Sequence, residues 1–86
     1  MKAGRDLWHY CVTVVTESDP DALVRVLGVF QSRNLVPRKV CALVDANECQ
    51  TIVIEISGVS ERELAMMRAK ITQFTCVIEA KWSRLD

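Results

Sequence analysis

The 86-residue chain lacks the features on which most nucleic-acid-binding, membrane and catalytic proteins depend. It has no excess charge, because eleven basic residues balance eleven acidic ones, and it has a single histidine. Without a positive field its surface does not gather phosphate backbones or anionic lipid, so we expect neither nucleic acid nor a membrane as a partner. No apolar run approaches the ~18 residues of a membrane helix, and polar His9 and Thr13 interrupt the first one, so no signal peptide is expected. We therefore expect a cytoplasmic protein.

The cysteines lack the spacing of a metal site. No two of the four, Cys11, Cys41, Cys49 and Cys76, form a C-x-x-C pair, and only His9 could join them as an imidazole ligand. Structural zinc sites use closely spaced cysteine and histidine ligands. In a reducing compartment these cysteines are better explained as free thiols that pack as small apolar side chains. We expect no metal and no cofactor.

The composition is that of a globular module. Hydrophobic residues make up 50% of the chain and charged residues 26%, which excludes intrinsic disorder and low-complexity linkers. The length allows one domain, residues 1–86, with a flexible N-terminus at residues 1–6. A small domain with exposed sheet edges and no net charge has little to keep its copies apart. Self-association is expected.

The first half of the chain predicts a strand, a helix and an edge strand. Leu7 to Thr16 alternates as a strand, with Tyr10, Val12 and Val14 on one face. Ser18 or Asp19 suits the N-cap of a helix with Pro20 and Asp21 in its first turn, and this helix should end near Asn34. Val36 to Val44 then predicts a strand whose Pro37, Arg38 and Lys39 are tolerated at a sheet edge.

The second half repeats this order. After a polar loop at 45–48, Thr51 to Ser57 predicts a strand with one apolar face, broken by Gly58. Ser60 and Glu63 form a capping box that begins a second helix. Thr75 to Trp82 predicts a last strand with one buried face. The apolar positions of the second helix are Leu64, Met67, Ile71 and Phe74, and those of the last strand are Cys76, Ile78, Ala80 and Trp82.

The resulting βαββαβ order predicts an α+β, ferredoxin-like sandwich. With right-handed crossovers the antiparallel sheet has the order 4-1-3-2, and both helices lie on one face. The loop after the first strand lacks the C-x-x-C of heavy-metal carriers and the glycines of a phosphate-binding loop. The third strand carries none of the aromatics that stack RNA bases. Trp8 and Trp82 lie on strands predicted to be adjacent, and they either form one apolar patch for a partner or simply pack.

The turn and first helix resemble those of the ACT domain, a regulatory module that senses amino acids. The matching segments read Ser18-Asp19-Pro20-Asp21-Ala22-Leu23 and Val26-Leu27-Gly28-Val29-Phe30. Within ACT domains the chain is most similar to the short small subunits of acetolactate synthase, whose helix also reads P-x-x-L-x-R-V-L. The resemblance covers nearly the whole chain.

The resemblance implies a homodimer with effector sites at its interface. Two such domains would pair through their second strands, and the dimer edge would include Val36, Arg38, Val40 and Ala42. The effector-binding residues it implies are Ser18, Asp19, Asp21, Ala22, Leu23 and Val36. The charges of Arg38 and Lys39 argue mildly against the edge pairing.

The effector site departs from the family pattern. Ser18 stands where amino-acid-binding members have asparagine, Asp21 where they have glycine, and Val36 where the small subunits have a second asparagine. Asp19 and Asp21 are also explained as helix-start residues. A carboxylate at Asp21 would repel the carboxylate of an effector unless it turned to solvent or paired with the ligand ammonium. Structural regulation is therefore favoured over feedback sensing.

The sequence predicts a regulatory protein and not an enzyme. No nucleophile-base or acid-base constellation is present, and the enzyme alternative has no support beyond the four cysteines. The favoured function is that of a small regulatory subunit that binds the large catalytic subunit of an acetolactate synthase-type enzyme in branched-chain amino acid biosynthesis, with an altered effector site. The alternative is a stand-alone homodimer that senses an amino acid through Ser18 and the first-turn N–H groups.

Overall fold

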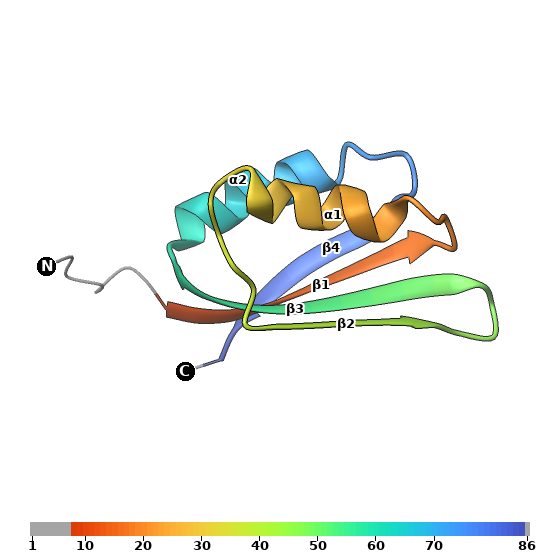
Figure 1. Cartoon of the computed structure of the whole chain (residues 1–86), viewed down its shortest axis with the longest axis horizontal. Coiled ribbons are helices and arrows are strands. Elements are labelled where there is room, and N and C mark those ends of the chain that lie inside the picture. The colour runs from red at the N-terminus through yellow and green to blue at the C-terminus, as the bar shows by residue number, and fades with distance from the viewer. Residues whose placement is uncertain (1–7, 86) are drawn as a thin grey trace, which may run out of the picture.

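The computed structural model describes residues 8–85 as four strands and two helices in βαββαβ order. They are β1 (Trp8–Glu17), α1 (Ala22–Gln31), β2 (Lys39–Val44), β3 (Cys49–Val59), α2 (Glu61–Ile71) and β4 (Val77–Arg84). The strands form one antiparallel sheet in the order β2-β3-β1-β4, and both helices cover the same face (Figure 1). This confirms the predicted ferredoxin-like fold. The expectation of a flexible start at residues 1–6 lies outside the described residues.

The core lies between the sheet and the helices. Alternation along β1 and β3 turns Tyr10, Val12, Val14, Ile52, Ile54 and Ile56 toward the helices, and each is at least 95% buried. Val26 and Phe30 of α1 and Leu64, Met67 and Ile71 of α2 close the core from above. The opposite face of the sheet is half-buried and uncovered. Within residues 8–85, neither helix is long and apolar enough to span a membrane.

Helix α1 begins later than its sequence predicts. The N-cap is Asp21, not Ser18 or Asp19, and Pro20 precedes the helix instead of occupying its first turn. The reason is a local turn, in which the Asp19 carboxylate accepts a hydrogen bond from Asp21 N at 2.8 Å and the Asp19 carbonyl accepts one from Ala22 N. The side chain of Asp21 makes no capping bond.

Helix α1 also ends earlier than predicted, and β2 starts three residues later than predicted. The helix ends at Gln31, because Asn34 adopts a left-handed conformation (φ 60°) and Leu35 N reaches back to Phe30 O. Together with the bond from Asn34 N to Gln31 O, this forms a Schellman motif. β2 begins at Lys39 and not at Val36, since Pro37 has no N–H to give to a ladder.

Two irregularities, one in β3 and one in β4, shift the phase of side-chain alternation. Gly58 (φ 78°) does not end β3 but forms a bulge against Trp8 and His9, which returns Val59 to the core. A second register shift, between Val15 and Thr16, leaves Ile78 58% exposed. The prediction that Ile78 lies on the buried face was therefore wrong. β4 itself runs from 77 to 84 instead of 75 to 82.

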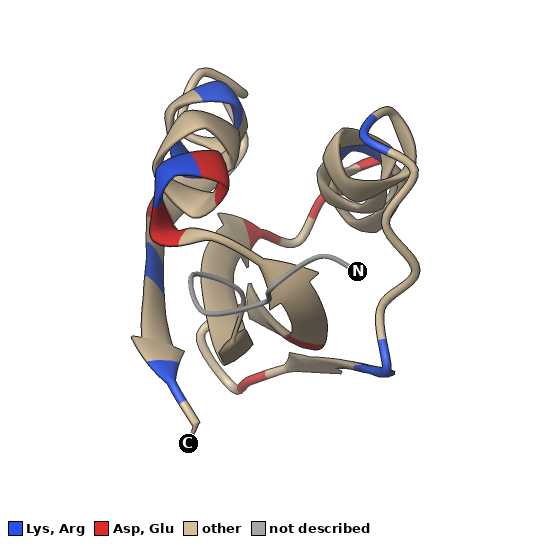
Figure 2. Cartoon of the chain, turned by 90° about the vertical axis from the view of Figure 1, so that its left-hand side faces the viewer, with Lys and Arg blue, Asp and Glu red and all other residues tan. Residues whose placement is uncertain are grey.

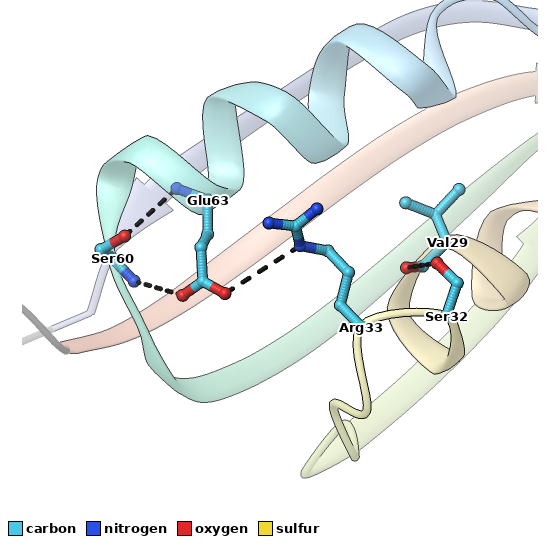
Figure 3. Close-up of polar contacts among 5 residues, drawn as sticks. All are labelled: Val29, Ser32, Arg33, Ser60 and Glu63. Carbon is cyan, nitrogen blue, oxygen red and sulfur yellow. Dashed lines mark hydrogen bonds and ion pairs between the residues drawn. The ribbon is translucent and has the colours of Figure 1, made fainter.

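The capping box of α2 is confirmed. Ser60 Oγ accepts a hydrogen bond from Glu63 N, and the Glu63 carboxylate accepts one from Ser60 N (Figure 3). The other carboxylate oxygen of Glu63 lies 4.0 Å from Arg33 Nε, so the same side chain links the start of α2 to the segment after α1. Two independent bonds and one ion pair therefore fix the first turn of α2.

Candidate functional site

The loop between β1 and α1 is held firmly to the sheet. Thr16 is fully buried, and its hydroxyl donates to Glu17 O at 2.7 Å. Glu17 N donates to Cys76 O at 2.8 Å, which ties the end of β1 to the segment before β4. These bonds anchor the start of the loop at the end of β1.

This loop satisfies its own amide groups. Asp19 accepts hydrogen bonds from the N–H groups of Asp21 and Ala22. The sequence suggested these first-turn N–H groups as ligand contacts. The side chains of Ser18, Asp19 and Asp21 are exposed, whereas Ala22 is fully buried and Leu23 partly so. Asp19 thus takes the place that an anionic ligand would occupy at these amides.

One chain does not bring the six predicted effector residues together. Ser18 precedes α1 and Val36 follows it, and a ten-residue helix is about 15 Å long. Figure 1 shows the two connections at opposite ends of α1. Val36 is 84% exposed, which is unusual for a large apolar side chain in a small domain. A site containing both Ser18 and Val36 needs a second chain.

Strand β2 presents an unpaired edge. The hairpin bond from Asp45 N to Cys49 O places the odd-numbered residues of β2 in the hydrogen-bonded pairs with β3. The N–H and C=O groups of Val40, Ala42 and Val44 therefore point away from the sheet. The predicted edge position of β2 is confirmed.

The side chains around this edge are apolar and exposed. Besides Val36, which precedes the strand, the exposed residues are Val40, Leu43 and Val44 of β2, and we call these four the β2 surface. Val40 and Ala42 of the predicted dimer edge lie in the strand, while Val36 and Arg38 precede it. The sequence pattern missed Leu43 and Val44, because strand periodicity does not show which apolar face remains uncovered.

The opposite edge of the sheet is occupied. Leu85 N donates to His9 O, which by the same alternation turns the main-chain groups of Ala80 outward. Arg68 of α2 donates from Nε to Ala80 O at 2.6 Å. The bulge beside Ile78 and the charges of Glu79 and Lys81 further interrupt this edge.

The remaining candidates do not form a reactive centre. All four cysteines are free thiols, and no three His, Cys, Asp or Glu side chains in the described part of the chain come together as a metal site. Trp8 and Trp82 both lie on the helix side of the sheet, partly buried against the core. Trp82 pairs with Val12, whereas Trp8 pairs with Val59, so they form no shared patch on the open face.

Residues 5–86 match the family of ACT-like domains. The chain belongs to this family. Comparison with curated proteins gave no match. The C-terminal domain of the MgtC protein from Mycobacterium tuberculosis is similar in structure (TM-score 0.76, 14% identity, 94% of this chain and 90% of that one). So is the ACT domain from GTP pyrophosphokinase of Chlorobium tepidum (TM-score 0.76, 13% identity, 90% and 99%).

Another similar structure is a homoserine dehydrogenase from Thiobacillus denitrificans (TM-score 0.75, 14% identity), of which the match covers 18% while covering 93% of this chain. At these identities the likeness establishes the fold. ACT domains are regulatory, ligand-binding modules, and this ACT-like domain has the same ferredoxin-like architecture.

Proposed function

We propose that this ACT-like domain acts as a homodimeric regulatory subunit, without catalytic activity of its own, for an acetolactate synthase-type enzyme of branched-chain amino acid biosynthesis. The observation that carries the dimer is the β2 surface, where an unpaired ladder adjoins four exposed apolar side chains. Pairing with a second β2 would satisfy the outward groups and bury this surface. The four free thiols support a reducing, cytoplasmic location.

The side chains of β2 favour one register for this pairing. A two-fold axis through Ala42 sets Val40 opposite Val44 of the partner subunit and Cys41 opposite Leu43 of the partner subunit. It also sets Lys39 opposite the partner's Asp45, on the same face, since odd-numbered residues share that face. If the two-fold axis instead passed through Cys41, Lys39 would face Leu43 of the partner subunit. If it passed through Leu43, Asp45 would face Cys41 of the partner subunit. The centred register therefore matches apolar with apolar and Lys39 with Asp45.

The same register would complete the split effector site. β2 would run antiparallel to its twin, so Val36 of the partner subunit would lie beyond the Val44 end of this strand. That end lies beside the end of β1, because Val44, Gln50 and Thr16 are neighbours across three strands. Asp19 already occupies two amides of the loop there, and Val36 offers no polar side-chain atom. These features support structural regulation over effector sensing.

Reconstitution with the catalytic subunit tests this function. The catalytic subunit of acetolactate synthase from the same organism is purified alone, and the ACT-like protein is then added over a range of concentrations. We expect co-elution of the two proteins and a saturable rise in synthase activity. A dimer by sedimentation that neither co-elutes with the synthase nor changes its activity would retain the interface and overturn the assigned enzyme.

The second candidate is an amino-acid sensor. It is favoured by exposed Ser18, which follows β1 at the end of the sheet that a partner's residues would reach. Calorimetric titration of the isolated protein with valine, leucine and isoleucine separates the two functions. Saturable heat from one of these amino acids supports the sensor, and its absence across all three supports structural regulation.

A further inference from the structure

The face of the sheet opposite the helices is uncovered in a single chain. Figure 2 shows α1 and α2 on one side of the sheet, and no helix of residues 8–85 lies on the other side. Between the two register shifts, the odd-numbered residues of all four strands point to this open face. At its centre they form two adjacent rows across the strands. The first row is Cys41, Val53, Thr13 and Lys81, and the second is Leu43, Thr51, Val15 and Glu79.

The two rows are apolar or weakly polar except at the β4 end. Leu43 is 68% exposed, and Val15 and Val53 are half-buried. At the β4 end Lys81 Nζ lies 3.6 Å from Glu79 Oε2, so the charges of the two rows form a pair with no net charge. Packing this face against a second sheet would remove its apolar side chains from water without gathering charge of one sign.

The first row is complementary to the second. A two-fold axis that runs across the strands, beneath the face and midway between the rows, sets each strand antiparallel to the same strand of a stacked copy. Stacked sheets keep their strand directions within about 30° of each other, an offset that the long side chains at the β4 end can span. The axis brings together Cys41 and Leu43, Val53 and Thr51, Thr13 and Val15, and Lys81 and Glu79.

Other axes match this face less well. An axis moved by one residue pair in one direction would set Val53 over Glu55 of the stacked copy, and in the other direction it would set Val15 over its Glu17. An axis along the strands would lay the apolar residues of β2 over the charged residues of β4. The central axis matches apolar with apolar and joins opposite charges.

We infer that two β2-paired dimers stack through this face into a tetramer. The axis of the β2 dimer passes through Ala42 perpendicular to the sheet, and the stacking axis crosses the strands at the level of Ala42. The axes therefore meet at a right angle, which closes the assembly. A dimer presents two open faces in one continuous sheet, so both contacts form together, whereas a single chain offers one. The inference rests on the β2 dimer of the proposed function.

Sedimentation velocity of the full chain at concentrations up to about 1 mM tests the tetramer. We expect dimers to give way to tetramers as the concentration rises. Val44→Glu, which blocks β2 pairing, should remove both species. A dimer that never grows overturns the stacking and retains the proposed dimer, whereas a dimer that survives Val44→Glu and is split by Lys81→Glu overturns the β2 dimer instead.

Exchanging the charges locates the contact. Lys81→Glu sets two carboxylates opposite each other at four sites in the tetramer, and at about threefold for each site the dimer–tetramer step should weaken by about a hundredfold. Lys81→Glu combined with Glu79→Lys restores opposite charges and should recover most of the affinity. Arg25→Glu makes the same change of net charge on α1 and should leave the tetramer intact. Equal weakening by Arg25→Glu, or no recovery in the double variant, overturns the stacking.

Co-elution with the synthase shows whether the catalytic subunit occupies this face instead. A parent protein that never exceeds a dimer, together with loss of co-elution in Lys81→Glu, would assign the face to the enzyme and overturn the stacking. A tetramer that Lys81→Glu splits while co-elution is retained would support it.

Discussion

The two edge strands of the sheet, β4 and β2, differ in how far they are protected from pairing with another strand. At the β4 edge, α2 supplies Arg68 to the outward carbonyl of Ala80, and a bulge and two charged side chains follow. At the β2 edge, the side chains of Val40, Leu43 and Val44 are exposed to solvent. Proteins block edges that must stay single with charges and bulges. The comparison indicates that β4 is closed to pairing and β2 is open.

The two helices also differ in their charged residues. α2 carries charged residues in its first and last turns, and its Arg68 reaches over the neighbouring strand. α1 has no acidic residue in its first turn and no basic residue in its last, and its exposed residues include apolar Val24. Arg38 and Lys39 lie at the start of β2, so their charges flank the strand instead of interrupting it. The mild argument that they raised against pairing therefore weakens.

The largest expected effect comes from a charge within the β2 edge. In the proposed dimer, Val44→Glu would place a carboxylate opposite Val40 of the partner subunit, at two equivalent contacts. At about 1.5 kcal/mol for each poorly solvated polar contact, dimerisation should weaken by about a hundredfold or more. Sedimentation equilibrium measures the change in the dissociation constant.

A charge pair tests the register of the same edge. Val40→Lys alone should also weaken the dimer, but Val40→Lys combined with Val44→Glu brings opposite charges together across the two-fold axis and should recover much of the affinity. Additive losses in the double variant would rule out the centred register. Ile78→Glu, an exposed position in β4, serves as the matched control and should leave the dimer unchanged.

The second prediction concerns the closed edge. Arg68→Ala removes the donor to Ala80 O, and hydrogen bonds from charged groups contribute about 1.5 kcal/mol or more, so unfolding free energy should fall by about that amount. Urea denaturation of the Val44→Glu background, in which the β2 edge is blocked, measures it without dimer dissociation. Arg25→Ala in the same background should change stability by less than about 0.5 kcal/mol. A loss no larger than that of Arg25→Ala would show that Arg68 does not protect the edge.

The sequence predicted the inner strands better than the edges. Strict alternation in β1 and β3 identified Tyr10, Val14 and Ile54 as core, because both strands have one covered face. Ile78 was misplaced, since a single bulge residue inverts the phase of alternation and leaves no mark in the pattern. The candidate effector site stays a prediction. Residues 18 to 23 precede or begin α1 and Val36 follows it, and the sequence pattern of one chain does not show which residues a second chain would contribute.

The third prediction compares the two helix starts. Ser60→Ala removes the capping acceptor for Glu63 N and should lower the unfolding free energy by about 1 kcal/mol. Asp21→Ala, at the N-cap of α1, should cost at most about 0.5 kcal/mol, because this side chain makes no capping bond and retains only its effect on the helix dipole. Thermal and urea unfolding measure both variants. Equal losses would mean that α1 depends on Asp21 in a way its geometry does not show.

The smallest expected effect comes from the ends of the β2 edge. Lys39→Gln removes two Lys39–Asp45 pairs from the proposed dimer, and exposed ion pairs contribute about 0.5 kcal/mol each, so the dissociation constant should rise by roughly fivefold at low salt. At about 1 M salt the difference from the parent should vanish, since the Debye length falls to about 3 Å. Lys81→Gln breaks the intrachain pair with Glu79, at 3.6 Å, on the opposite edge and should leave association through β2 unaltered at every salt concentration. A salt-independent effect of Lys39→Gln, or an equal effect of Lys81→Gln, would contradict this prediction. The charges of the two edges would then not differ in their contribution to dimerisation.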